Sequence, residues 1–310
     1  MGSQQTAIVN KLLTDVSNKI EPQGYVSEQI FPMVKVVQST GKLGSYGTGH
    51  MRILTTLTGG KNKYPTVDTR QQSTQTYSID KHGLSDMVTE EEYANVEKPF
   101  DAEADTTDEL TTLLWLAKEK GIADSLTDTA VLTNNVTLSG TDQYTDYTNS
   151  DPLGDFKTAR ASVYNKVGMA PDTVILPWAV YDTLRYHPKI LEVGYKYNRS
   201  GKLTLDDLAA VFDVKRVLIA EAIYESANQG QTSAILPVWG KHIVFAVSPT
   251  TAAKRQVSLG YRFQQFSDTR RVYKNAVTNP ANAKEILVDD HYDYLIANAD
   301  AGYLIKDSIA

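Results

Sequence analysis

The clearest fold information in the chain lies in residues 173–224, TVILPWAVYDTLRYHPKILEVGYKYNRSGKLTLDDLAAVFDVKRVLIAEAIY. The apolar run Thr173–Leu176 predicts a buried strand. Pro177 follows it and can open a helix, because a proline at the first helical position gives up no hydrogen bond. We expect that helix to end before Pro188, since the residue that precedes a proline is driven out of the α region.

The second helix of this stretch has a stronger start signal. Thr204 stands at an N-cap position with Asp207 three residues later, which is a weak capping box, and Leu208 and Phe212 follow at helical spacing. Arg216–Ala220 then changes to a β-branched, strand-like run. The stretch therefore predicts two helices over a small sheet, joined by an irregular connector, and it contains no recognisable catalytic group.

Length and composition limit the classes of protein that remain. With 310 residues and 41% hydrophobic side chains, the chain can bury one large or two medium cores. Its formal net charge of −6 argues against a dedicated nucleic-acid binder, which normally presents a basic surface. The absence of cysteine excludes disulfides, thiolate nucleophiles and zinc–thiolate sites. No apolar run approaches the ~18–20 residues of a membrane span, so we expect a soluble, intracellular protein.

The first 40 residues have the pattern of an arm. Ile8, Leu12 and Val16 are spaced as in a short amphipathic helix, and Pro22 and Pro32 interrupt regular structure after it. An apolar stripe on a terminal segment needs a surface to cover it. Either the body of the same chain or a neighbouring molecule would serve.

The next two segments carry opposite charge. Residues 41–70 are glycine-rich and contain five Lys or Arg side chains and one acid, whereas 80–109 contain eleven acids and two lysines. The basic segment predicts a projecting hairpin with weak strands over 50–58 and 66–79. In the acidic segment, Pro99 and Asp101 mark the start of a long helix over about 100–126, with acids in the first turns where the macrodipole favours them.

The rest of the chain alternates between helix and strand patterns. Residues 153–166 predict a helix, and 233–247 predict two strands hinged at Trp239 and Gly240. Two long strands are expected near the end of the chain, over about 257–275 and 284–297.

The motifs of catalysis are almost absent. The chain has no phosphate-binding glycine loop, and its five histidines are scattered. Asp289, His291 and Asp293 would share one face of a strand, where two carboxylates and an imidazole could bind a divalent metal or act as acid and base. A solvated strand face in an acidic protein is the commoner explanation. A metal-dependent α+β enzyme that uses these three residues therefore remains an alternative hypothesis.

Several strings in the chain resemble the major capsid proteins of tailed bacteriophages, which share the Hong Kong 97-type fold. In family order they cover nearly the whole length. They are SEQIFPMVKVVQSTGKLGSYGTGHMRI (27–53), EEYANVEKPFDAEADTTDEL (91–110), YHPKILE and LDDLAAVFDVKRVLIAEAIY within the stretch quoted first, PVWGKHIVFAVSPT (237–250) and NADAGYLIKD (298–307).

The resemblance implies an α+β fold with a defined order of parts. Residues 1–40 are expected to form the N-terminal arm, 41–79 the extended E-loop, and 80–172 the peripheral domain with its spine helix at about 100–126. Residues 173–247 correspond to the axial domain, and 248–310 return to the peripheral domain and the C-terminus. In this arrangement residues 195–202 and 225–233 are candidates for facing neighbours in a ring.

The resemblance also implies a function. The chain is expected to self-assemble into pentamers and hexamers of an icosahedral shell around phage double-stranded DNA, in the virion capsid, after assembly in the host bacterial cytoplasm. It implies no enzymatic activity, no cofactor and no membrane partner. Portal, scaffolding and decoration or cement proteins are the implied partners, and DNA would be held non-specifically. An encapsulin-like cellular compartment of the same fold is the alternative within this class.

One hypothesis joins the charge pattern to the resemblance. In this family the E-loop lies over the peripheral domain of a neighbouring subunit, so basic side chains of the loop are expected to dock onto acids of a neighbour. A merely solvated loop and helix start would explain the same charges. The bases are Arg52, Lys61, Lys63 and Arg70, and the acids are Glu90, Glu91, Glu92, Glu97, Asp101, Glu103 and Asp105.

Overall fold

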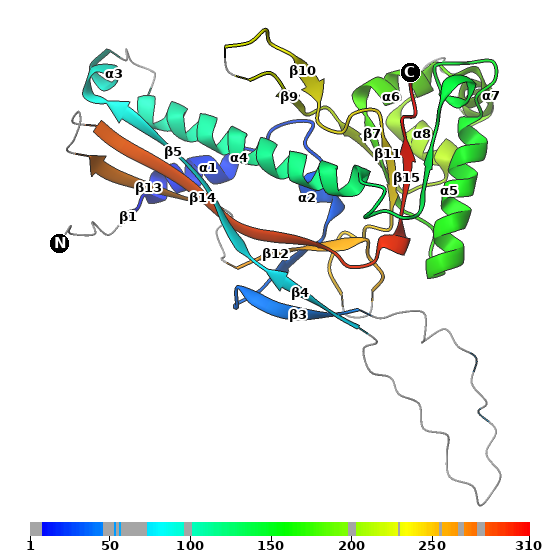
Figure 1. The fold of residues 1–310 in the computed structure, drawn as a ribbon, viewed down its shortest axis with the longest axis horizontal. Helices are drawn as coiled ribbons and strands as arrows, with labels where there is room; N and C mark the ends of the chain where they lie inside the picture. Colours follow the sequence, from blue (N-terminus) through cyan, green and yellow to red (C-terminus); the bar gives the residue numbers. More distant parts are fainter. Residues whose placement is uncertain are drawn as a thin grey trace, which may run out of the picture.

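The computed structural model contains two sheets, with one long helix lying along the first (Figure 1). It describes residues 8–45, 53, 56, 73–95, 101–197, 203–228, 230–253, 256–265, 270–277 and 283–310. Helices cover both sheets, and two separate hairpins extend from the body.

The first sheet has six strands, in the order β1-β13-β14-β12-β2, with β5 also paired to β14. The strand β14 is fourteen residues long and pairs with β13, β12 and β5, all antiparallel, so it organises the sheet. The strands of this sheet are β1 (Ile8–Val9), β2 (Met33–Lys35), β5 (Asp80–Thr89), β12 (Gly260–Gln264), β13 (Arg270–Val277) and β14 (Ala283–Ile296).

The helix α4 (Ala102–Thr127) covers one face of this sheet and confirms the predicted long helix. Asp101 is its N-cap, and the Asp101 side chain accepts a hydrogen bond from the backbone N–H of Glu103 at 3.1 Å. Its 26 residues give a rod about 40 Å long. Leu110 and Leu114 pack in one apolar cluster with residues of β13 and β14, so the helix is fixed along the sheet.

The N-terminal helix α1 (Lys11–Lys19) buries a different face from the one predicted. The Asn10 side chain accepts hydrogen bonds from the N–H groups of Leu12 and Leu13, which starts the helix at Lys11. Leu12, predicted on the apolar stripe, is 74% exposed. Ser17 is buried because its hydroxyl has a partner, the Thr111 hydroxyl of α4, at 2.8 Å. The body of the same chain therefore covers this helix, and the short helix α2 (Ser27–Ile30) follows it.

The second sheet has five strands in the order β6-β15-β11-β7-β8. Four helices pack around it at the end of the molecule opposite the free ends of β13 and β14 (Figure 1). The strands are β6 (Asn135–Thr137), β7 (Thr173–Pro177), β8 (Arg216–Ala220), β11 (Ile243–Ala246) and β15 (Gly302–Lys306), and the helices are α5 (Pro152–Val167), α6 (Trp178–Arg185), α7 (Pro188–Tyr197) and α8 (Leu205–Phe212).

Most of the predicted elements of residues 173–224 are confirmed. The capping box of α8 is complete, since Thr204 and Asp207 each accept from the other's backbone N–H. The prediction of an irregular connector after the first helix is wrong, because Pro188–Tyr197 form the helix α7. Pro188 ends the preceding helix and also occupies the first position of this new one.

The second sheet also includes strands that lie outside residues 173–247. β6 and β15 belong to this sheet, and α5 packs against it. The ring of Phe156 in α5 meets those of Phe212 and Phe245 edge to face, with centroids 4.5 and 5.2 Å apart. The C-terminal segment therefore leaves the first sheet at the end of β14 and enters the second sheet as β15.

Two hairpins and three short helical segments complete the described chain. They are β3 (Thr40–Ser45) with β4 (Ser73–Ser78), β9 (Ile223–Glu225) with β10 (Ile235–Pro237), α3 (Glu90–Asn95), and the 3₁₀ turns η2 (Gly140–Asp142) and η3 (Ala299–Ala301). The strand predicted over 66–79 contains β4, which is shorter than the prediction. The strand predicted over 50–58 lies outside the described residues except for Ile53 and Thr56.

The strand predicted over 257–275 is two strands, and β5 was not expected at all. The register with β14 steps from Gln264↔Tyr292 in β12 to Arg270↔Asp290 in β13, so the two segments are not one continuous strand. In β5, eight of ten residues are exposed, so its sequence lacks the alternation that marks a half-buried strand.

Candidate assembly surfaces

A buried group of charged side chains fixes the N-terminal arm to the body. The Lys118 ammonium of α4 lies 2.7 Å from Glu28 Oε1 in α2 and 3.5 Å from Asp290 Oδ2 in β14. Arg262 of β12 also pairs with Glu28. The Tyr292 ring lies 4.4 Å from the Lys118 nitrogen and adds a cation–π contact. The arm, the long helix and the first sheet therefore meet at one lysine.

These neighbours determine the protonation of the two carboxyl groups. Burial alone would raise the pKa of Glu28, but the charges of Lys118 and Arg262, and their hydrogen bonds, lower the pKa of Glu28 to about 2. Burial raises the pKa of Asp290, and the nearby cations offset this only in part. Glu28 therefore remains charged through the whole physiological range.

Glu119 makes a second junction, one residue further along α4. One carboxylate oxygen accepts from the N–H of Val26 at 3.1 Å and from the indole nitrogen of Trp239 at 2.7 Å. The other accepts from the N–H of Ser27 at 2.9 Å. Because Trp239 stands just before β11, this residue joins the arm, the long helix and the second sheet.

The predicted metal trio does not form one site. The Asp289 carboxylate lies 3.0 Å from the Lys81 ammonium, and Asp293 accepts from the backbone N–H of Ser78 at 2.9 Å. Each acid therefore holds β5 or β4 on β14. His291 stands opposite Lys81 in the strand register, and burial lowers the pKa of His291. Across the described ranges, no three His, Asp or Glu side chains are grouped so that they could hold a metal ion.

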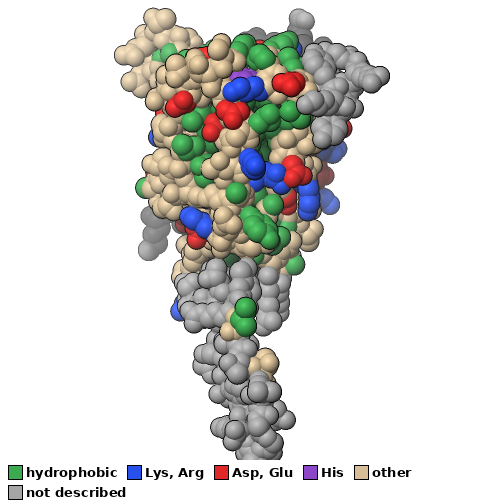
Figure 2. Space-filling model, turned by 90° about the vertical axis from the view of Figure 1, so that its right-hand side faces the viewer, with side chains coloured by type: hydrophobic (Ala, Val, Ile, Leu, Met, Phe, Trp, Pro, Cys, Tyr) green, Lys and Arg blue, Asp and Glu red, His purple; other side chains and the backbone are tan. Residues whose placement is uncertain are grey.

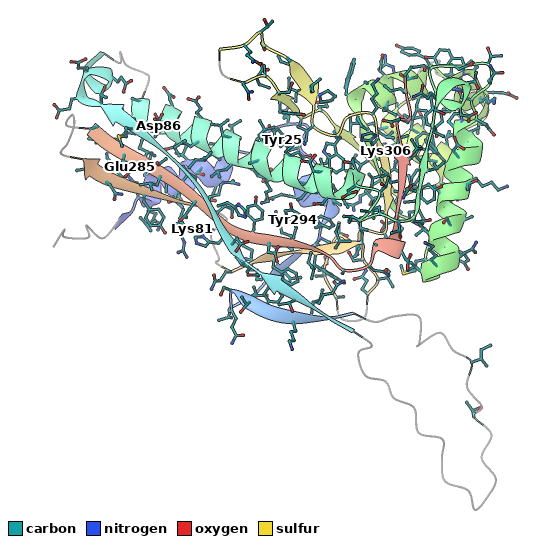
Figure 3. The ribbon with its side chains drawn as sticks, in the orientation of Figure 1. Tyr25, Lys81, Asp86, Glu285, Tyr294 and Lys306 are labelled. Carbon is teal, nitrogen blue, oxygen red and sulfur yellow. The ribbon has the colours of Figure 1, made fainter. Side chains whose placement is uncertain are left out.

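Most of the acids predicted to dock onto a neighbour lie within the described residues, close to two further acids, Asp86 and Glu285. Figure 3 shows Asp86 and Glu285 near the end of the first sheet, beside α3. Glu90, Glu91 and Glu92 begin α3 and are exposed, although Glu92 also accepts from the backbone N–H of Thr89 at 2.8 Å. Asp101 and Asp105 are exposed at the start of α4. These acids are available to a partner, and their role between subunits stays a prediction.

Glu103 differs from the other predicted acids because its carboxylate is buried and used within the chain. Lys284 lies 3.1 Å from Glu103 Oε1, and Lys274 pairs with the same oxygen. Hydrogen bonds from both lysines lower the pKa of Glu103, although burial acts in the opposite direction. Sequence reasoning missed these partners because they lie on β13 and β14, far along the chain. Glu97, Arg52, Lys61, Lys63 and Arg70 lie outside the described residues.

Figure 2 shows the face of the molecule at the end formed around the second sheet, and the described side chains there are of mixed charge. In Figure 2 acidic, basic and hydrophobic side chains are interspersed over this end. The described residues on this face therefore form no basic stripe of the kind that phosphate binding requires. Within the described ranges, no helix combines the length and the apolar character needed to cross a bilayer.

Comparisons with known proteins agree with this architecture. The major capsid protein of Burkholderia phage BcepMu is 27% identical to the chain over 310 residues, which cover 96% of each sequence. A phage-related protein from Bordetella bronchiseptica RB50 superposes with a TM-score of 0.73 at 24% identity, over 98% of this chain and 99% of that one. The capsid of cyanophage P-SCSP1u superposes with a TM-score of 0.58 at 8% identity, over 89% of this chain and 86% of that one. No family model matches the sequence.

The long helix over one sheet and the second sheet with its four helices give the chain an α+β fold that matches phage capsid structures and is consistent with the Hong Kong 97-type fold. Two phage major capsid proteins match the chain over nearly its whole length, at 27% and 24% identity, and these relatives support a phage major capsid protein. The same relatives support a capsid shell-forming protein. The encapsulin alternative has less support, because the sequence relatives are phage capsid proteins.

Proposed function

We propose that the chain assembles into pentamers and hexamers that tile an icosahedral shell around phage double-stranded DNA. The observation that supports this most strongly is the match to a phage major capsid protein over 96% of both chains. The subunit also suits the role physically. Its arm, long helix and two sheets are joined at Lys118 and Glu119 into one rigid tile, and the β3–β4 hairpin lies below the first sheet (Figure 1).

In this proposal, three parts of the chain correspond to the E-loop, the peripheral domain and the axial domain of a shell subunit. Residues 41–79 form the E-loop that reaches a neighbour, the six-stranded sheet with α4 forms the peripheral domain, and the five-stranded sheet with α5–α8 forms the axial domain. Supporting this division, Leu110 and Leu114 of α4 pack on the first sheet and α5–α8 pack on the second, while Ile122 and Leu126 at the end of α4 join the core of the second sheet. β6, α5 and β15 belong to the axial domain in this scheme, in addition to residues 173–247.

Charge is the proposed means of docking the E-loop. Arg52, Lys61, Lys63 and Arg70 of one subunit would meet exposed acids of α3 and α4 on the next. Each exposed pair contributes only ~0–1 kcal/mol, but the same pairs recur at every contact of a shell and set its register. Of the predicted acids we leave out Glu103, because Lys274 and Lys284 already neutralise it.

The remaining partners follow from the proposed shell. Portal, scaffolding and decoration proteins would meet the assembled surface, and DNA would be enclosed without specific binding. An acidic chain with net charge −6 suits this, because a wall that bound phosphates tightly would oppose packing and release of DNA. Assembly would take place in the host cytoplasm. We propose no enzymatic activity, since the acids of the predicted metal trio serve the sheet.

Negative-stain electron microscopy of the purified full-length chain tests the proposal. We expect closed particles of uniform diameter at moderate salt. Small monodisperse oligomers that never close, at any salt or protein concentration, would contradict it. If particles form only when a scaffolding protein is co-expressed, shell formation is supported and dependence on that partner is established as well.

A further inference from the structure

The β9–β10 hairpin has two unlike faces. Leu236 and Tyr224 are directly paired and share the face toward α4, because residues opposite each other in an antiparallel ladder lie on one side. Tyr224 packs on the main core, and the Lys120 nitrogen of α4 lies 5.2 Å from its ring centre. This inner face anchors the hairpin to the body.

The outer face of the hairpin is apolar and open. Ile223 and Pro237 form one pair, and Ile235 is paired with Glu225, so all four lie on the side away from α4. Ile223 is 57% exposed and Ile235 is 62% exposed. Nothing in the described part of the chain covers these two side chains. Adjacent branched aliphatic residues on a protruding hairpin are typical of a contact surface.

The hairpin is also held in shape before any contact forms. The Glu225 carboxylate accepts from the backbone N–H groups of Ala227 and Ala234, at 3.0 and 2.6 Å, and the Ser233 hydroxyl donates to it as well. These bonds brace the connection between β9 and β10. A surface fixed in advance loses little conformational entropy when a partner binds.

The opposite edge of the molecule is complementary. β3 and β4 lie below the first sheet in Figure 1, whereas the β9–β10 hairpin rises above α4. The segment 33–45 contains β2 and β3. It exposes Met33 and Val37, and Val37 is 92% exposed. It contains Lys35 and Lys42 and no acid, whereas residues 221–238 contain two glutamates and no Lys or Arg. An apolar patch with a basic rim therefore lies opposite an apolar patch with an acidic rim.

We propose that the outer face of the β9–β10 hairpin in one copy of the chain docks against the segment 33–45 of a second copy. The two patches differ and lie on opposite edges, so the contact is head to tail and repeats from subunit to subunit until a ring closes. A symmetric contact of two hairpins would instead bring Glu225 toward its own copy. This inference rests on the proposed assembly into rings and names one contact within them.

Cysteine cross-linking tests the contact, because the natural chain contains no cysteine. Assembled V37C/I235C particles would be treated with a bismaleimide and run on a denaturing gel. We expect a ladder of linked subunits up to a closed ring, with only monomers from V37C and from I235C alone. The control V37C/M169C, which uses exposed Met169 beyond the end of α5, should give no ladder.

The outcomes separate this contact from the proposed function. Particles of V37C/I235C that cross-link no more than V37C/M169C would overturn the contact while leaving the shell intact. Dimers from I235C alone would also overturn it, because they report a symmetric contact. Wild-type chain that never closes into particles would overturn the proposed function, and this contact with it.

A charge substitution gives an independent readout. Ile235→Asp places a carboxylate on the outer face of the hairpin, so we expect at least a tenfold lower yield of particles. Met169→Asp, at a comparably exposed site, should assemble as the wild type does. Thermal unfolding of the unassembled subunits should be the same for both variants, since both side chains are exposed. Equal particle yields from the two variants would overturn the proposed contact.

Discussion

The indole nitrogen of Trp239 donates a hydrogen bond of 2.7 Å to the Glu119 carboxylate, and both side chains are buried. The two residues are 120 positions apart in the chain. Trp239 precedes the central strand of the second sheet, and Glu119 belongs to the helix that covers the first. The bond therefore joins the two halves of the subunit. In a shell it would help to keep their relative orientation fixed when neighbouring subunits make contact.

The first prediction concerns this bond. Trp239→Phe removes the donor and leaves a buried carboxylate with fewer partners, so the free energy of unfolding should fall by about 1–3 kcal/mol. Urea denaturation of the unassembled subunit measures it. Trp178→Phe is the control, because Trp178 is 54% exposed, and it should change stability by less than about 0.5 kcal/mol. Equal stability of the two variants would contradict the assigned role.

The second prediction concerns pH. The pKa of Glu28 is about 2 in the folded chain against 4.5 ordinarily, so its charge stabilises the fold above pH 4.5 and this stabilisation is lost as the pH falls toward 2. At about 1.4 kcal/mol for each pKa unit, the contribution is at most about 3.5 kcal/mol. Glu28→Gln should therefore be clearly less stable than wild type at pH 6 and nearly equal to it at pH 2. Denaturation curves across this range measure the gap, and a constant gap would exclude the assigned pairing.

The third prediction separates structural acids from docking acids. Glu103→Gln leaves Lys274 and Lys284 without their shared carboxylate, so the free energy of unfolding should fall by about 1–3 kcal/mol. Glu91→Gln should leave stability unchanged, because Glu91 is exposed, and should instead slow assembly at low salt. Denaturation and light scattering of the same two variants give both readouts. The distinction fails if Glu91→Gln is the less stable variant.

The fourth prediction tests the proposed docking of the E-loop. Reversing Lys61 and Lys63 to glutamate should impair assembly, most strongly at low salt where exposed charges are least screened. Lysines introduced at Glu90 and Glu91 should restore part of it.

The matched control for this reversal is Lys157→Glu with Lys215→Glu, two exposed lysines outside the proposed contact. It changes the net charge equally and should assemble as wild type does. Particle counts by microscopy measure all three variants. Normal particles from the Lys61 and Lys63 reversal would refute the docking model.

Elements with local signals were predictable from the sequence. The capping box at Thr204 and Asp207 fixes the start of α8, and Asp101 fixes that of α4, because these side chains satisfy backbone N–H groups near them in the chain. Pro188 shows the limit of such signals. It correctly ended α6, but the same residue begins α7, and only the packing of Ile190 into the core distinguishes a second helix from a loop.

Features that depend on distant partners were not predictable. Glu103 looks like any acid in the first turn of a helix, and only the pairing of β13 with β14 brings Lys274 and Lys284 to it. Thr14 and Ser17 lie on the buried face of α1 because each has a hydrogen-bonding partner there, the N–H of Val272 in β13 and the hydroxyl of Thr111 in α4. The charged junction at Lys118 joins four segments of the chain, and no local spacing reveals it.

The most direct test of the account is a cryo-electron microscopy reconstruction of particles formed by the full-length chain. The account predicts a closed icosahedral shell with rings of five and six subunits, in which α4 and both sheets keep the arrangement described for the single chain. A purified chain that forms no closed particle, or a shell built without such rings, would contradict it.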